Sequence, residues 1–86
     1  REAHSDDAGV RIFPWKGQNG FLYLAVLNRS GNWRSASVTL AGAVQEAYDI
    51  ETGVRLNHKE SEINVPLFPA GGRMIAVRIG KGEKSK

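Results

Sequence analysis

Residues 21–27, with the sequence FLYLAVL, are apolar at every position. A strand with one face in water alternates apolar and polar side chains, so a strand without alternation is typical of a position covered on both faces. Residues 16–20, KGQNG, come before it and residues 28–32, NRSGN, follow it, and both are rich in turn-forming residues. We therefore expect residues 21–27 to form the central strand of a sheet, covered on both faces.

Shorter apolar or alternating runs recur on both sides of this strand at the spacing typical of small β-sandwiches, roughly every eight to twelve residues. They comprise residues 10–15, 34–40, 44–50, 54–56, 63–67 and 74–79. Pro14 cannot donate a ladder hydrogen bond, which favours either an edge strand for residues 10–15 or the end of a strand at Pro14. Gly53 follows Glu51 and Thr52 at a position where a tight turn needs a left-handed residue. These features predict an all-β fold, an antiparallel β-sandwich of about seven short strands of immunoglobulin-like or Greek-key type.

Alternation also predicts which side chains face inward, because successive residues of a strand point to opposite faces. In residues 34–40, for example, Ala36, Val38 and Leu40 share one face and the two serines and Thr39 share the other. The same reasoning along the other strands predicts one core, made of Ile12, Leu22, Leu24, Val26, Val38, Leu40, Ile63, Val65, Ile75 and Val77.

The chain has 86 residues, which is too short for two cores of ordinary size. Residues 1–8 contain almost no apolar side chain and residues 81–86 contain none, so we expect a flexible head or linker and a flexible basic tail. Residues 9–80 then form a single β-sandwich domain. The only methionine is Met74, and we expect the chain to be part of a longer protein.

Charge and composition argue against several classes of function. The net charge of +3 comes from 12 basic and 9 acidic residues, and the basic residues are scattered rather than clustered as in nucleic-acid-binding surfaces. No apolar run approaches the ~18–20 residues of a membrane span. The chain has no cysteine, and therefore no disulfide, thiolate nucleophile or cysteine zinc site. We expect no nucleic-acid or membrane partner, no cofactor and no metal, and the sequence leaves the compartment open.

Side chains that support catalysis are sparse. His4 and His58 stand apart, one in the head and one in a polar loop. Asp49 and Glu51 flank Ile50 at the edge of a turn, where we expect them in water. A glycosidase instead needs paired carboxylates across a cleft, one of them kept protonated by an apolar pocket. We therefore expect no enzymatic activity from this domain alone and assign no catalytic residue.

The aromatic residues are the candidate interaction sites. Phe13, Trp15, Trp33 and Phe68 lie at strand ends or in loops, and they exceed what seven short strands need inside. We expect them to form an interface with a neighbouring domain or a surface on which sugar rings stack. The competing interpretation is that Phe13, Tyr23 and one tryptophan pack the core or cover its rim.

Three segments resemble a known kind of domain: residues 22–30, LYLAVLNRS; residues 47–53, AYDIETG; and residues 65–77, VPLFPAGGRMIAV. They are similar to the small C-terminal β-sandwich domain of many bacterial glycoside hydrolases, including α-amylase-like and β-galactosidase-like barrel enzymes. The resemblance implies a non-catalytic domain that packs on the catalytic domain of the same polypeptide, stabilises it and sometimes contacts carbohydrate. No catalytic residue carries over, because in that family the acid and the nucleophile lie in the barrel.

Two other classes of function remain open from the sequence. One is a carbohydrate-binding module, which would expose Trp15 or Trp33 to stack on sugars. The other is an immunoglobulin-like or fibronectin-like spacer of a surface protein, which would belong to a series of sandwich repeats.

Overall fold

The computed structural model describes residues 3–5 and 7–80 of the chain. The predicted tail, residues 81–86, lies outside the described residues. Within them the chain forms eight strands: β1 (Ala3–Ser5), β2 (Val10–Lys16), β3 (Phe21–Asn28), β4 (Arg34–Leu40), β5 (Val44–Asp49), β6 (His58–Lys59), β7 (Glu62–Leu67) and β8 (Gly72–Ile79). None of the described residues belongs to a helix long and apolar enough to cross a membrane.

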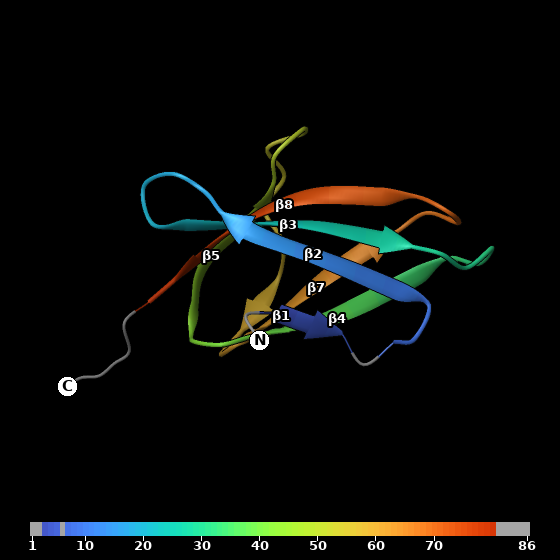
Figure 1. Cartoon of the computed structure of the whole chain (residues 1–86), viewed down its shortest axis with the longest axis horizontal. Coiled ribbons are helices and arrows are strands. Elements are labelled where there is room, and N and C mark those ends of the chain that lie inside the picture. Colours follow the sequence, from blue (N-terminus) through green and yellow to red (C-terminus); the bar gives the residue numbers. More distant parts are fainter. Residues whose placement is uncertain (1–2, 6, 81–86) are drawn as a thin grey trace.

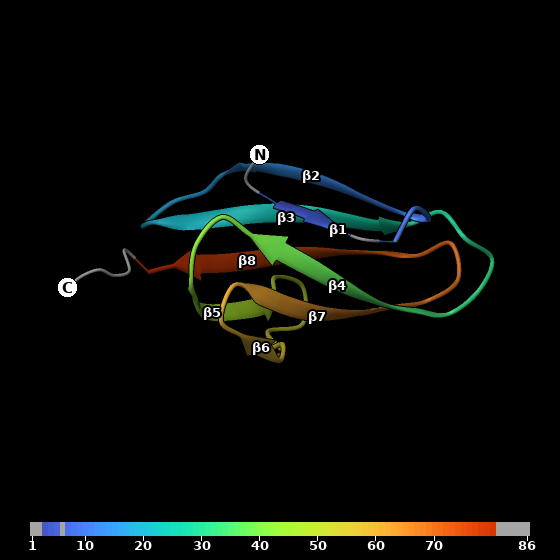
Figure 2. The ribbon, with the colours of Figure 1, turned by 90° about the horizontal axis from the view of Figure 1, so that it is seen from below.

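The strands form two four-stranded antiparallel sheets, one in the order β1-β4-β7-β6 and the other in the order β2-β3-β8-β5. In Figure 1 the sheet that contains β3 and β8 lies above the sheet that contains β4 and β7. Figure 2 shows β4 and β7 in front of the second sheet. The predicted all-β antiparallel sandwich is therefore confirmed.

Two connections that cross between the sheets run side by side. Residues 29–33 lead from β3 to β4, and residues 68–71 lead from β7 to β8. Because β3 pairs with β8 and β4 pairs with β7, both connections lie at the same end of the sandwich, the right-hand end in Figures 1 and 2. The pairing of the strands thus brings together two loops that are far apart in the sequence.

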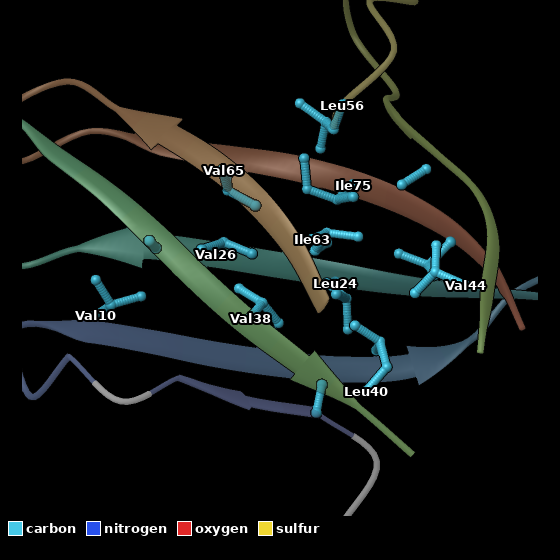
Figure 3. Close-up of a cluster of buried hydrophobic side chains, with 14 of the residues drawn as sticks. Val10, Leu24, Val26, Val38, Leu40, Val44, Leu56, Ile63, Val65 and Ile75 are labelled. Carbon is cyan, nitrogen blue, oxygen red and sulfur yellow. The ribbon is translucent and has the colours of Figure 1, made fainter. Parts of the chain in front are cut away.

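The core lies between the sheets, as Figure 3 shows for Leu24 and Val26 of β3 and Val38 of β4. Eight of the ten predicted core residues are buried, namely Leu24, Val26, Val38, Leu40, Ile63, Val65, Ile75 and Val77. Ile12 and Leu22 are partly buried and pack against this cluster. The predicted core is confirmed, and its alternation follows from the two-residue period of a strand.

Strand β3 lies between β2 and β8, which confirms its central place in a sheet. The expectation that it is covered on both faces is wrong. Leu24 and Val26 are fully buried, but Leu27 on the other face is 40% exposed, and Tyr23 and Ala25 are partly exposed. A two-layer sandwich covers only one face of each sheet, so the second apolar face of β3 lies on the outside.

Three segments differ from the strand prediction. Ala3–Ser5, expected in a flexible head, form β1 and pair with residues 38–40 of β4, because Ala3 is small and apolar enough to be buried at the edge of the core. His58 and Lys59, expected in a loop, form a short hairpin with β7. Residues 54–56, expected to be a strand, keep only an isolated bridge between Tyr48 and Arg55, because the chain here leaves β5 for the other sheet.

Two details of the local prediction are confirmed. Strand β2, which contains Pro14, lies at the edge of its sheet, where the missing N–H breaks no ladder. Gly53 has a φ of 75°, in the left-handed region that a side chain disfavours. Its N–H donates to the carbonyl oxygen of Asp49 at 2.8 Å and closes the turn.

Candidate functional site: an apolar sheet face and an aromatic pair

The outer face of the β2-β3-β8-β5 sheet carries a continuous set of apolar side chains. Because Ile12, Leu24 and Ile75 point into the core, the residues next to them in each strand point outward. Phe13 pairs with Ala25, and Ala25 pairs on its other side with Met74, whose carbonyl oxygen accepts a hydrogen bond from the N–H of Ile50. The next row of paired residues on this face crosses all four strands, in the order Trp15, Tyr23, Ala76 and Tyr48.

We call these eight residues the apolar sheet face: Phe13, Trp15, Tyr23, Ala25, Tyr48, Ile50, Met74 and Ala76, of which Ala76 is itself fully buried. Phe13 is 48% exposed, Trp15 41% and Ile50 41%. The rings of Trp15 and Tyr23 meet edge to face, with centroids 6.0 Å apart and an angle of 82°. The rings are thus held against one another while much of their apolar area remains in contact with water.

Arginines border this face on two sides. Arg78 lies over the ring of Phe21, 4.4 Å from its centroid, and Arg11 lies 5.7 Å from the centroid of Phe13. Glu46 accepts hydrogen bonds from Arg55 at 3.0 Å and from Arg78 at 3.5 Å. The border therefore carries three guanidinium groups and one carboxylate, with an excess of positive charge.

The second exposed feature is the pair formed by Trp33 and Phe68, which we call the aromatic pair. Trp33 is 66% exposed and Phe68 is 56% exposed. Their ring centroids are 4.7 Å apart at an angle of 59°. Trp33 belongs to the β3–β4 connection and Phe68 to the β7–β8 connection, so the pair exists because these two loops lie side by side.

Asn28, at the end of β3, ties the two loops together. Its side chain is buried, and its Nδ2 donates to the carbonyl oxygens of Asn32 and Phe68, both at 2.8 Å. Its Oδ1 accepts from the N–H of Ser30 at 3.0 Å. The N–H of Ala70 donates to the carbonyl oxygen of Ser30 at 2.8 Å, which adds a direct link between the loops. Asn28 to Ser30 also matches the glycosylation pattern, but this amide nitrogen is already used to hold the turn.

Asp49 is buried, so the expectation that it lies in water is wrong. Its Oδ1 accepts from the N–H groups of Glu51 and Thr52, and its Oδ2 accepts from Arg73 at 2.7 Å. Burial alone raises the pKa of Asp49, but the hydrogen bond from Arg73, those from Thr52 and Glu51, and the charge of Arg73 together hold the pKa below its ordinary value.

Arg73 extends this link to the other sheet. Its Nε donates to the carbonyl oxygen of Pro66 in β7 at 2.6 Å. Asp49 and Arg73 therefore join the turn after β5, strand β8 and strand β7. Both oxygens of the Asp49 carboxylate accept hydrogen bonds in this structural link. The lowered pKa favours the deprotonated form, which does not suit a proton donor.

The described residues contain no group of three or more His, Asp or Glu side chains placed to hold a metal ion. Two hollows in the surface have polar or mixed linings. One of about 320 Å³ lies beside β4, β6 and β7 and is lined by Ser35, Ser37, Asn57, His58, Lys59, Glu62, Ile63 and Asn64. One of about 470 Å³ lies at the end of the sandwich opposite the aromatic pair and is lined by Lys16, Gly17, Gly20, Phe21, Leu22, Ala41 and Ile79.

The structure separates the four aromatic residues singled out from the sequence into two pairs. Phe13 and Trp15 lie within β2 on the apolar sheet face, whereas Trp33 and Phe68 form the aromatic pair in the loops. Sequence reasoning assigned Tyr48, Met74 and Ile50 to no site, because Tyr48 and Met74 belong to strands whose other face supplies the core and Ile50 lies in the turn after β5. The lack of alternation in residues 21–27 was the signal that a second apolar face exists.

Comparison with protein-family models, with curated protein sequences and with solved structures found no match to this chain. The class that the structure defines is a two-sheet antiparallel β-sandwich domain.

Proposed function

We propose that this chain is a non-catalytic accessory domain of a larger glycoside hydrolase, and that it packs its apolar sheet face on the catalytic domain of the same polypeptide. The choice of parent enzyme comes from the resemblance of residues 22–30, 47–53 and 65–77 to such domains. The observation that supports docking is the apolar sheet face itself, which spans all four strands of one sheet.

The size of this face suits a contact between domains. Strands about 4.8 Å apart and same-face residues about 7 Å apart make a patch of roughly 250–300 Å² in projection. Interfaces between domains of one chain bury roughly 600–1,500 Å². The apolar sheet face would therefore form the centre of such an interface, and the side chains that border it would supply the rest of the buried area.

The border of the face indicates the chemistry of its partner. Arg11, Arg55 and Arg78 outnumber Glu46 there, and Arg78 is partly held by its contact with Phe21. Complementary charge favours an apolar surface bordered by carboxylates. The catalytic domain is thus expected to present such a surface to this sheet.

The test compares the chain alone with the chain joined to the catalytic domain of its parent enzyme. Trp15→Ser is expected to leave the thermal midpoint of the isolated chain nearly unchanged, because Trp15 lies outside the core. In the joined protein it should remove about 1–3 kcal/mol of docking free energy, as loss of a central aromatic contact does, and lower the unfolding temperature.

Trp33→Ser is the matched control, because Trp33 is also an exposed tryptophan but lies outside the apolar sheet face. It is expected to leave the unfolding of the joined protein unchanged. If Trp15→Ser and Phe13→Ser also leave it unchanged, the domain does not dock through this face, and the function of a plain spacer is the better account.

A further inference from the structure

Strand β2 has an open backbone edge. It pairs with β3 on one side, and in Figure 2 no strand of its sheet lies beyond it on the other side. The remaining edges are short or covered: β1 has three residues and β6 has two, and backbone groups of residues 54–60 bond to Val44, Ala47 and Asp49 of β5. Within residues 3–5 and 7–80, β2 is therefore the one long edge strand without a neighbouring strand on its outer side.

Two hydrogen bonds at the ends of the β2–β3 hairpin show which groups of β2 point to this edge. The N–H of Gly17 donates to the carbonyl oxygen of Phe21 at 2.9 Å, and the N–H of Arg29 donates to the carbonyl oxygen of Gly9 at 2.8 Å. Both pairs join odd-numbered residues, and the ladder bonds between two antiparallel strands recur at every second residue. The odd-numbered residues of β2 therefore bond to β3, and its even-numbered residues point their N–H and C=O groups outward.

Pro14 is one of the outward-pointing residues and has no N–H to offer. Its side chain is exposed. Ile12 and Lys16 each present an N–H at the same edge, whereas the N–H of Val10 already donates to the carbonyl oxygen of Asp7 at 3.0 Å. The proline therefore removes a donor from the middle of the open edge, where pairing with another strand would need it.

The side chains of β2 are self-complementary along this edge. When two copies of β2 run antiparallel about a two-fold axis, one register places Phe13 opposite the second copy's Phe13. The same register places each Arg11 opposite the other copy's Trp15. Aromatic pairs directly across two strands and an arginine beside an indole ring are both favourable. Because the two copies contribute the same residues, this contact has the form of a symmetric dimer interface.

The backbone opposes pairing in this register. Each Pro14 lies opposite the second copy's Ile12, and such a pair normally exchanges two hydrogen bonds. Here the N–H of Ile12 can donate, but its carbonyl oxygen faces the proline ring, and the two-fold axis repeats this loss. The edge is about 23 Å long and a sheet layer is about 10 Å thick, so the contact covers on the order of 200 Å² per copy. Stable interfaces take about 800 Å² per partner, so the backbone bonds determine whether two copies pair.

We propose that the edge of β2 is a self-complementary surface for a second copy of this chain, and that Pro14 prevents the dimer from forming. Natural β-sheet proteins protect open edges with proline and lysine, and Lys16 lies on the same edge. The proposal goes beyond the proposed function. A chain that does not pair with itself leaves Phe13 and Trp15 free to contact another domain of its own polypeptide.

Sedimentation velocity of the 86-residue chain tests this role of Pro14. Pro14→Val restores the N–H, so we expect about a hundredfold tighter self-association, about tenfold for each of two restored hydrogen bonds. Pro66→Val is the matched control, because Pro66 lies in β7 between β4 and residues 54–57. The control and the wild type should remain monomeric at the same concentrations. Circular dichroism measures folding, and Pro14→Thr replaces Pro14→Val if the latter does not fold.

A single cysteine tests the register, because the chain contains none of its own. Phe13→Cys places two thiols opposite each other at the two-fold axis. The Cα atoms of such a non-hydrogen-bonded pair lie about 4.5 Å apart, within the range of a disulfide. With oxidised glutathione as the oxidant, we expect this cross-link to form faster when Pro14→Val is also present. Trp33→Cys, at an exposed position outside β2, is the control and should cross-link at a rate that Pro14→Val does not change.

Three results would contradict the proposal. A folded Pro14→Val variant that is as monomeric as the wild type overturns it, and so does a wild-type chain that associates as strongly as this variant. Equal cross-linking of Phe13→Cys with and without Pro14→Val overturns the pairing through β2. None of these results bears on docking, which is tested through Trp15→Ser in the joined protein.

Discussion

Asp49 shows how a single residue supports the fold. It lies before the turn of residues 50–53, which the sequence already indicates through Thr52 and Gly53. The ion pair with Arg73, 24 residues away, depends on the pairing of β5 with β8. A carboxylate that looks solvated in the sequence is therefore a buried link between strands.

Asp49→Asn is expected to lower the free energy of unfolding by about 1.5–3 kcal/mol at pH 7, because it removes the charge from a buried hydrogen bond to Arg73. The folded pKa of Asp49 is lowered, so this stabilisation is present above the unfolded pKa and is lost as the pH falls through the folded pKa. Urea unfolding at pH 7 and at progressively lower pH should show the difference between the two proteins shrinking. Glu51→Gln, at an exposed carboxylate of the same turn, is the control and should cost less than about 0.5 kcal/mol.

Asn28→Ala is expected to destabilise the chain by about 1–3 kcal/mol, since it leaves the carbonyl oxygens of Asn32 and Phe68 without their donor. The environment of Trp33 should change with it, measured by its indole signal and by thermal unfolding. Asn57→Ala removes an exposed asparagine side chain and serves as the control. Equal stability of the two variants would contradict the role assigned to Asn28.

Strand β3 is apolar on both of its faces, and the two faces have different surroundings. Its seven apolar residues alternate between the core and the outer face of the sheet, and only the first face is covered within the domain. Leucine therefore occurs on both faces of one strand with different energetic roles.

Leu24→Ala is expected to cost about 2–5 kcal/mol, as other large-to-small substitutions in close-packed cores do. Leu27→Ala, three residues along the same strand but on the 40% exposed face, should cost less than about 1 kcal/mol. Thermal and urea unfolding of both variants measure the contrast. Similar losses would mean that the faces of β3 are assigned incorrectly.

Strand β1 gives a second test of an element. Ala3→Asp is expected to destabilise the chain by about 1–3 kcal/mol, because Ala3 is 5% exposed and an acidic group there would be buried without a partner. His4→Asp, at the exposed neighbouring position, is the control. If both are neutral, the pairing of β1 with β4 contributes nothing to stability, as the sequence-based expectation of a loose head would have it.

At the scale of the whole molecule, the two outer surfaces of the sandwich differ. The β2-β3-β8-β5 sheet presents aromatic and aliphatic side chains, whereas the other sheet presents Ser35, Ser37 and Asn64 around a polar hollow. One outer surface of the domain is therefore apolar and the other is polar.

The isolated chain is expected to hydrolyse no aryl glycoside. Glycosidases need two carboxyl groups about 5–10 Å apart on either side of a bound sugar, and Asp49 is fully engaged by Arg73 and the turn. Release of nitrophenol from aryl glycosides measures this directly. Activity that copurifies with the chain and disappears on Asp49→Asn or Glu51→Gln would contradict the prediction, and unchanged activity in both variants would indicate a contaminant.

Those features of the protein that follow local rules could be predicted from the amino-acid sequence. Alternation placed the ten core residues correctly, Pro14 indicated an edge strand and Gly53 indicated a left-handed turn position, because each depends on neighbouring residues or on a single backbone angle. The expected strand at residues 54–56, the expected absence of a strand at residues 3–5 and the expected exposure of Asp49 were wrong, because each depends on which strand lies alongside.

The organisation of the surface could not be predicted in this way, because it depends on the order in which the strands pair. Phe13 and Trp15 share a face with Tyr48 and Met74 because β2, β3, β8 and β5 pair in that order, and Trp33 meets Phe68 because two crossing loops lie side by side. The order of the strands is a long-range property that the period of a strand does not encode. The sequence therefore identified the exposed aromatic residues, and the pairing of the strands divided them between two surfaces.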